Sequence, residues 1–407
     1  VAIGHDVLRE SNASNNTAVG FQAMVANTTG TNNTALGYGA LDANTTANNN
    51  TAIGYDALTA NTTGADNTGV GEQVLKANTT GDANTAVGEN ALTANTTADG
   101  NTAVGKSALA ANTTGTFNVA IGYLTLDACV DGSKNNAVGS FALTNYDPSS
   151  AEDSHNNAFG YNALGANTTG KYNTAMGGNC LDSNTTADNN TAVGYSAMTA
   201  NTTGVNNVAI GKEALDANTT TSQNTAVGHS ALGANTASDN TAVGMRALST
   251  NTTGTENTSV GKDALKLNST GNYNTAMGND ALLNNVVSDN TAFGYKALLA
   301  TTTGADNVAV GSGALDANTT GRMAVAVGKD ALGNNTTGEF NVALGREAMA
   351  SNTTGHFNVA VGLNALAGNT TADGNVAVGR NAGVNITTGH ENVAIGAYSL
   401  DAVTTGN

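Results

Sequence analysis

A four-residue motif recurs along the whole chain at a nearly constant spacing. It reads Thr, Val or Asn, then a small residue, an apolar residue and Gly, and it occurs 24 times between Val1 and Val393. Of the 23 intervals between copies, 19 are 17 residues long, three are 16 and one is 21. A 17-residue repeat is too short for a pair of helices, which needs more than about 30 residues. The period therefore indicates one turn of a β-solenoid.

The idealised repeat reads [TV]-A-[VI]-G-x-x-A-L-x-A-N-T-T-G-x-x-N, and its places are called coil positions 1 to 17 below. Coil positions 1–3 and 7–10 resemble short strands, whereas the Gly at position 4 and the Asn-Thr-Thr-Gly at positions 11–14 supply turns. We predict an all-β fold, a parallel β-solenoid (β-roll) of about 24 coils with two short strands per coil. Residues 1–407 would form one continuous repeat region, and stacking at about 4.8 Å per coil would give a rod on the order of 110 Å long.

Alternation along a strand predicts which side chains face inward, because residues two apart share a side. We expect Thr102 and Val104 to face the core, together with Leu109 and Ala111. The Gly at position 4, present in every copy, indicates a backbone conformation or a close approach that a Cβ would block. Asparagines such as Asn112 and Asn118 would bond local backbone or stack as amide ladders between coils.

Coil position 2 is Ala in 22 copies, and the same alternation places it outside. A solvent-facing position would vary in sequence, as position 9 does. We therefore predict that this face packs against another copy of the chain, most simply in a homotrimer; packing against a local turn is the alternative. The residues of the predicted inter-chain face are Ala18, Ala35, Ala52, Ala86, Ala103 and Ala120.

Charge and composition exclude several classes of partner. The formal net charge is −17, and no cluster of Lys or Arg could neutralise phosphates, so we predict no binding to nucleic acid. No apolar stretch approaches the about 20 residues that span a bilayer, so no membrane insertion is expected. The sequence opens inside the repeat and lacks an initiator Met, so we expect it to be an excerpt of a longer protein.

The repeated Val-Ala-Ile-Gly and Thr-Ala-Val-Gly segments, each followed by x-x-Ala, resemble the head repeats of trimeric autotransporter adhesins. They also resemble repeat regions in tail-fibre proteins of marine phages, to which the full unit at residues 101–115 is closer. The resemblance covers essentially the whole chain. It implies a left-handed parallel β-roll, trimeric assembly and, for a tail fibre, a C-terminal intramolecular chaperone. The 17-residue period is longer than is typical of adhesin heads, and the mid-coil Leu and Asn-Thr-Thr-Gly lack a counterpart there.

Few residues suggest chemistry, and we predict no enzyme, no cofactor and no metal site. The five histidines fall on separate turns. Cys129 and Cys180 lie three coils apart, about 14 Å along the axis, beyond disulfide reach, so free thiols are expected. The Gly-Gly-x-Gly-x-Asp pattern of calcium-binding coils is absent. Acidic residues near position 15, such as Asp82, Asp99 and Asp188, are interpreted as solvated turns.

One coil carries four extra residues and predicts a protruding loop at about 143–156. Loops on repeat scaffolds often carry binding specificity. The candidate residues for a cation or a polar receptor group are Tyr146, Asp147, Glu152, Asp153 and His155. A tolerated surface insertion is the simpler interpretation and the one we favour.

Two recurring sequence features allow further functional interpretations. Tyr38, Tyr55 and other aromatics at position 5 could stack on sugars, although edge shielding is the favoured interpretation. The Asn-Thr-Thr tripeptides could be glycosylation acceptors. Their second threonine, as in Thr46, Thr63 and Thr80, could instead form the regular row of an ice-binding solenoid.

The leading functional hypothesis is a structural fibre shaft of a phage tail fibre or bacterial adhesin, located extracellularly, on the cell surface or on a virion. Such a shaft would space a receptor-binding tip from its anchor and contribute to attachment. One alternative is a module that binds glycan or ice along its repeated face, with a cell-surface glycan or receptor as partner. The other is a self-polymerising filament subunit.

Overall fold

The computed structural model describes residues 1–148 and 152–406. The chain divides into two compact units, Val1–Asn206 and Asn207–Asn407. Each unit contains twelve strands, one in each repeat. None of the described residues forms a helix, so none of them supplies a helical membrane span.

The strands of the first unit are β1 (Ala2–Ile3), β2 (Thr17–Val19), β3 (Thr34–Leu36), β4 (Thr51–Ile53), β5 (Thr68–Val70), β6 (Thr85–Val87), β7 (Thr102–Val104), β8 (Val119–Ile121), β9 (Asn136–Val138), β10 (Asn157–Phe159), β11 (Thr174–Met176) and β12 (Thr191–Val193). Those of the second unit are β13 (Val208–Ile210), β14 (Thr225–Val227), β15 (Thr241–Val243), β16 (Thr258–Val260), β17 (Thr275–Met277), β18 (Thr291–Phe293), β19 (Val308–Val310), β20 (Val325–Val327), β21 (Val342–Leu344), β22 (Val359–Val361), β23 (Val376–Val378) and β24 (Val393–Ile395).

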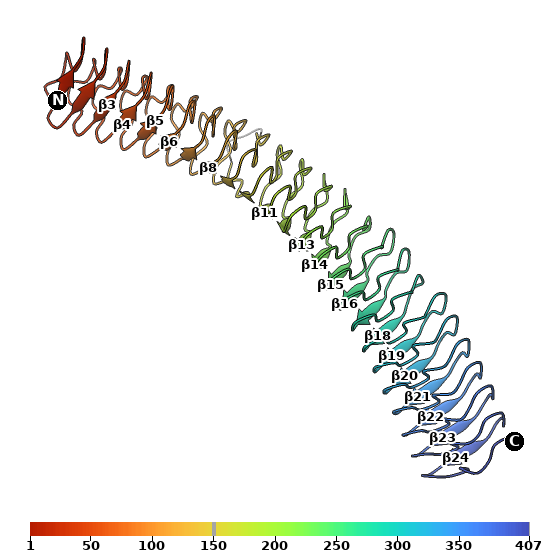
Figure 1. Cartoon of the computed structure of the whole chain (residues 1–407). Coiled ribbons are helices and arrows are strands. Elements are labelled where there is room, and N and C mark those ends of the chain that lie inside the picture. The colour runs from red at the N-terminus through yellow and green to blue at the C-terminus, as the bar shows by residue number, and fades with distance from the viewer. Residues whose placement is uncertain (149–151, 407) are drawn as a thin grey trace. The chain divides into compact units, whose positions relative to one another are not determined.

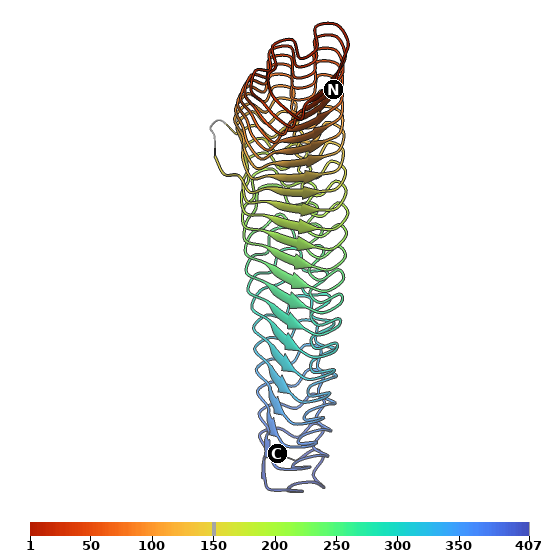
Figure 2. The same ribbon diagram turned by 90° about the vertical axis from the view of Figure 1, so that its left-hand side faces the viewer.

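Within each unit every strand pairs in parallel with the strand of the next repeat, in the same register (Figure 1). Ala86 thus lies beside Ala103, and Val87 lies beside Val104. Within each unit the strands follow one another as successive rungs in the view of Figure 2. The predicted all-β parallel solenoid with about 17 residues per coil is confirmed.

The prediction of two strands per coil is wrong, because coil positions 5–10 form turns rather than a second strand. In the coil that starts at Thr102, Ser107 and Leu109 have φ angles of 57° and 52°. Such left-handed residues break an extended segment. Ser107 N donates to Glu89 O of the preceding coil (2.9 Å), and Leu109 N donates to Thr125 O of the following coil (3.1 Å). The turn is therefore bonded to both of its neighbours without forming a regular strand.

The predicted facing of the strand is also reversed. Thr102 and Val104 lie on the outside and are half-buried, whereas Ala103 between them is fully buried. Leu109 faces the core as predicted, and Ala103 and Ala108 of the same coil are fully buried as well, whereas Ala111 is only half-buried.

The six alanines assigned to an inter-chain face are consequently buried inside their own chain: Ala18, Ala35, Ala52, Ala86, Ala103 and Ala120. The physical reason is the width of the coil interior. A Cβ added to Gly69, which takes the same coil position, would lie 3.0 Å from Val74 and 3.4 Å from Leu58. The small residue therefore leaves room for the position-8 leucine instead of meeting a partner.

The glycine at coil position 4 has the role that its recurrence predicts. Gly228 has a φ of +135°, and a Cβ added to it would lie 2.5 Å from the carbonyl oxygen of Gly244 in the next coil. Both the backbone conformation and the contact between coils therefore exclude a side chain.

We expect Gly228→Ala to lower the free energy of unfolding by about 1–3 kcal/mol from backbone conformation alone, with a further cost from the close contact. Urea unfolding followed by circular dichroism measures the effect. Gly233→Ala in the same coil is the matched control, because its added Cβ would have no neighbour closer than 3.4 Å. Equal unfolding midpoints for the two variants would contradict this account of the glycine.

Candidate functional sites

Two buried rows of asparagine side chains connect successive coils over much of the chain. At coil position 11, Asn61 Nδ2 donates to Asn44 Oδ1 of the preceding coil (3.1 Å) and to Gly64 O within its own turn (2.9 Å). Its Oδ1 accepts from Asn78 Nδ2 of the following coil (2.8 Å). The side chains of Asn44, Asn61 and Asn78 are fully buried, which confirms the predicted amide ladder.

The second row, at coil position 17, spans the gap between coils in a different way. Asn50 Oδ1 accepts from the backbone nitrogen of Asn67 in the next coil (2.9 Å). Asn50 Nδ2 donates to Gly64 O of that coil (2.9 Å). One side chain thus satisfies two backbone groups of its neighbour, which a hydrocarbon side chain could not do.

The Asn-Thr-Thr tripeptides belong to the same network. Thr45 Oγ1 donates to Thr62 O of the next coil (3.0 Å), and the Thr45 backbone nitrogen donates to the same oxygen (3.1 Å). Because the preceding Asn44 is buried and hydrogen bonded, the folded coil does not present it as a glycosylation acceptor. The second threonine of the tripeptide is exposed, as at Thr46 and Thr63, and in some coils the first is exposed as well, as at Thr28.

Coil position 15 has a role that sequence reasoning missed. Asp82 Oδ1 accepts from the backbone nitrogen of Ala65 (2.7 Å), and Asp99 Oδ1 accepts from that of Asp82 (2.7 Å). His356 Nδ1 accepts from Glu339 N in the same way (3.0 Å). The shared property of these residues is an acceptor atom that reaches the preceding coil. Their recurrence at the same coil position was the sequence signal that could have revealed these hydrogen bonds between coils.

The residues proposed for a binding loop do not converge on one site. Tyr146 is fully buried in the core, and Asp147 Oδ1 accepts from the backbone nitrogen of Val130 (3.3 Å). His155 stacks on Tyr172, with ring centroids 5.8 Å apart. Residues 149–151 of the predicted insertion at 143–156 lie outside the described part of the chain.

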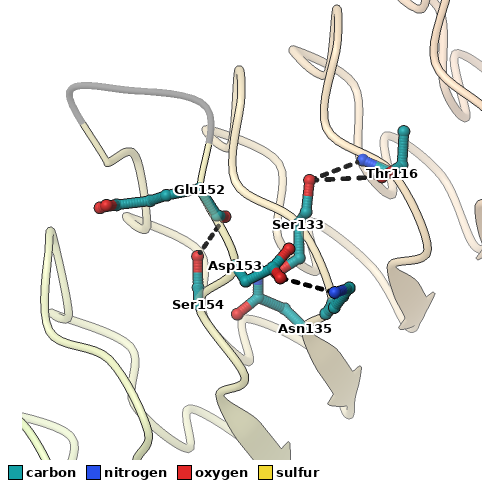
Figure 3. A network of polar contacts seen from close by, with 7 residues as sticks. Thr116, Ser133, Asn135, Glu152, Asp153 and Ser154 are labelled. Atoms are coloured by element: carbon teal, nitrogen blue, oxygen red, sulfur yellow. Dashed lines mark hydrogen bonds and ion pairs between the residues drawn. The ribbon is translucent and has the colours of Figure 1, made fainter.

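The two acidic candidates are each paired with a lysine of the solenoid. Lys134 Nζ lies 2.5 Å from Asp153 Oδ2, and Lys171 Nζ lies 2.5 Å from Glu152 Oε1. Glu152 also accepts at its carbonyl oxygen from Ser154 Oγ (3.2 Å) and from Ser133 N (3.0 Å), so the segment rejoins the coil stack (Figure 3). Each of these two carboxylates therefore has a lysine partner within the chain.

Cys129 and Tyr146 interrupt the position-11 asparagine row in two successive coils. Both are fully buried, and a Cβ added to Gly132 would lie 2.9 Å from Cys129 Sγ and 2.8 Å from Tyr146 Cε1. These contacts indicate a local packing cluster. Burial raises the pKa of Tyr146 above its usual range and raises that of Cys129 to about 12.

Four successive aromatic side chains at coil position 5 cover one another's ring faces. His5, Phe21, Tyr38 and Tyr55 form a continuous stack with centroid separations of 5.4, 5.3 and 5.2 Å. The planes are inclined by only 10–13°. The inner ring faces that a sugar would use are occupied by the neighbouring ring, which agrees with edge shielding.

Four aspartates at coil position 9 are partly withdrawn from water. Burial is the main cause that raises the pKa of each above its usual value, and they are Asp42, Asp182, Asp216 and Asp316. A raised pKa in the folded chain favours the protonated carboxyl, so ionisation of these groups lowers stability as the pH rises.

In the part of the chain that the structure describes, no three His, Cys, Asp or Glu side chains gather in a way that could hold a metal ion, and no pocket is found.

Comparison with known proteins finds no family model and no curated protein that matches the chain.

We expect Asn61→Asp to destabilise the chain by about 3 kcal/mol or more at pH 7, because it places an unpaired charge in the buried amide row. The introduced carboxyl should have a pKa above its unfolded value of about 3.9. Its destabilising effect should therefore be smallest at acidic pH and grow as the pH rises through the folded pKa. Chemical denaturation at pH 4 and pH 7 measures both effects.

Asn48→Asp is the matched control for that substitution. Asn48 Oδ1 accepts from Thr31 N (2.7 Å), and Asp82 makes the equivalent bond two coils later. A carboxylate preserves this acceptor, so the control should change stability by less than about 0.5 kcal/mol. A similar loss in both variants would contradict the role assigned to the buried row.

We expect neither native thiol to react with a disulfide reagent in the folded chain at pH 8. Both cysteines are free, as predicted, and buried, and burial raises each thiol pKa to about 12, so the reactive thiolate is scarce. Absorbance of the released thiolate should report two thiols only after urea is added. Thr63→Cys, at an exposed position, is the control and should react at once. Rapid labelling of the folded native chain would contradict the burial of the two cysteines.

Proposed function

We propose that this chain is a structural fibre shaft, of the kind found in phage tail fibres and bacterial adhesins, which holds a binding tip at a fixed distance from its anchor. The observation that carries the proposal is the repeated linkage of successive coils by buried asparagine side chains, such as Asn44–Asn61–Asn78. These bonds add to the strand pairing and to the threonine bonds, so bending a coil away from its neighbour would break several buried hydrogen bonds at once.

The repeat supports this function in a second way, because each coil adds the same increment of length. Coils stack at about 4.8 Å per step, so the length of a unit depends on how many repeats it has. A shaft of this kind can be lengthened or shortened by whole repeats without altering any contact type. The proposed location is extracellular, on a cell surface or on a virion, which follows from the resemblance of the repeat.

Removal of residues 34–101, which make up four whole repeats, should leave the remaining coils folded and shorten the first unit by about 19 Å. Spin labels at Thr29→Cys and Thr169→Cys, both exposed, lie eight coils apart, so their separation should fall from about 38 Å to about 19 Å. Dipolar electron resonance measures this separation, and the buried native cysteines should stay unlabelled.

Removal of residues 34–93 is the control, because it deletes a similar length but breaks the phase of the repeat. We expect this variant to lose its circular dichroism signal or its cooperative unfolding. An unchanged label separation after the in-phase deletion would overturn the proposed spacer role, as would equal tolerance of both deletions.

Ice binding is the second candidate, favoured by one observation. The second threonines of successive tripeptides, including Thr46, Thr63 and Thr80, are exposed at a regular spacing. Thermal hysteresis of a solution of the chain tests this function directly, and its absence would exclude it.

A further inference from the structure

The outward face of the strands is apolar along both units. Coil position 3 points away from the core, and in all 24 repeats it is Val, Ile, Leu, Met or Phe. Coil position 1, on the same side, is Thr in 13 repeats, Val in nine and Asn in two. The side chains are accessible: Val87 is 37% exposed, and Leu36 and Met176 are each 47% exposed. We call the first and third strand residues of a unit its outer strand face.

This composition is not what a solvated strand face requires. Coil position 9, which is also partly accessible in many coils, varies freely among residues such as Asp42, Thr59 and Lys76. The third strand position never carries a polar or charged residue. Monomeric proteins rarely expose contiguous apolar patches larger than a few hundred Å², and larger patches usually mark an interaction surface. The outer strand face therefore has the composition of an interface.

We propose that the outer strand face is the surface through which copies of this chain pack together, with a second copy as its occupant. The inference deepens the proposed fibre function by assigning the contact that would join the chains of a shaft. It replaces the buried alanines as the self-association surface.

The spacing of the rows argues for a copy of the same chain. Apolar side chains on this face recur once per coil, at the separation of paired parallel strands, about 4.8 Å. A partner can stay in contact along twelve successive rows only if its own side chains recur at the same interval. Another copy of this solenoid meets that condition in every coil, whereas the surface of a globular protein does not.

Charge gives a second argument. The chain carries a net charge of −17, so two copies repel each other over most of their surfaces. Neither the first nor the third strand position holds an Asp, Glu, Lys or Arg in any of the 24 strands. A face that lacks charge throughout is the place where two acidic chains can meet without burying like charges.

The size of the face is sufficient for a stable contact. Each unit has twelve coils with outward coil positions 1 and 3, which gives 24 such positions per unit. Stable protein interfaces use about 20–30 residues on each side. One unit alone therefore offers enough residues for a specific interface.

The test is the mass of the intact chain in solution, measured by sedimentation equilibrium. We expect the unaltered chain to sediment as a discrete multiple of its 40.2 kDa mass. A variant with Leu36→Lys, Val87→Lys and Met176→Lys should sediment at 40.2 kDa with an unchanged circular dichroism spectrum. The control, with Thr46→Lys, Thr97→Lys and Thr186→Lys in the same three coils, should keep the mass of the unaltered chain, because these exposed threonines lie on the turn.

A milder variant, with Leu36→Thr, Val87→Thr and Met176→Thr, keeps the test informative if the lysine variant fails to fold. Threonine already occupies the first position of these three strands, so it suits the strand, and association should weaken at least tenfold. The proposal is overturned if the unaltered chain is a monomer, or if a folded outer-face variant keeps its mass. If the chain is a monomer but its spin-label separation still changes with the number of coils, the proposed interface is wrong and the proposed spacer function is not affected.

Discussion

The hydrogen bonds between coils are the constraint on which the rest of the structure depends. A 17-residue coil cannot satisfy its own buried amides, because so short a loop has no interior sheet or helix to pair them. It therefore needs a neighbour of the same shape. The asparagines at coil positions 11 and 17 hydrogen bond to groups outside the paired strands, as Asn61 and Asn50 do. Similar residues recur in the sequence because each coil must offer the hydrogen-bonding groups that the preceding coil requires.

The narrow interior explains the remaining regularities of the repeat. The position-8 leucine fills the coil, so the strand residue that faces it can be no larger than Ala, Ser or Gly. Ser259 fits there because its hydroxyl donates to Ala264 O (2.8 Å). The leucine itself adopts a left-handed conformation, as at Leu109 with φ of 52°, which costs about 1–2 kcal/mol. Complete burial of its side chain contributes about 1.5–3 kcal/mol, enough to offset that cost.

The period, the parallel stacking, the role of the recurrent glycine and the amide ladders could all be predicted from the sequence, because each follows from spacing alone. The facing of the strand could not. Threonine and valine suit either face of a strand, so alternation alone allowed either coil positions 1 and 3 or coil position 2 to face the core. Only the limited space beside Leu58 and Val74 decides between these two arrangements. The surroundings of the candidate loop could not be predicted for a related reason. Lys134 and Lys171, which pair with its acidic residues, come from other coils, and the repeat does not reveal which side chains reach one another.

Hydrogen exchange of single backbone amides, followed by nuclear magnetic resonance, tests the central claim most directly. The backbone nitrogens of Asn50, Asn67 and Asn84 each donate to the asparagine side chain one coil earlier, at 2.9 Å. If stacked coils hold the chain together through these bonds, the three amides should exchange only through global unfolding, as slowly as the amides of the paired strands. Exchange of these amides at the rate of an unfolded peptide, while the strands stay protected, would contradict the account.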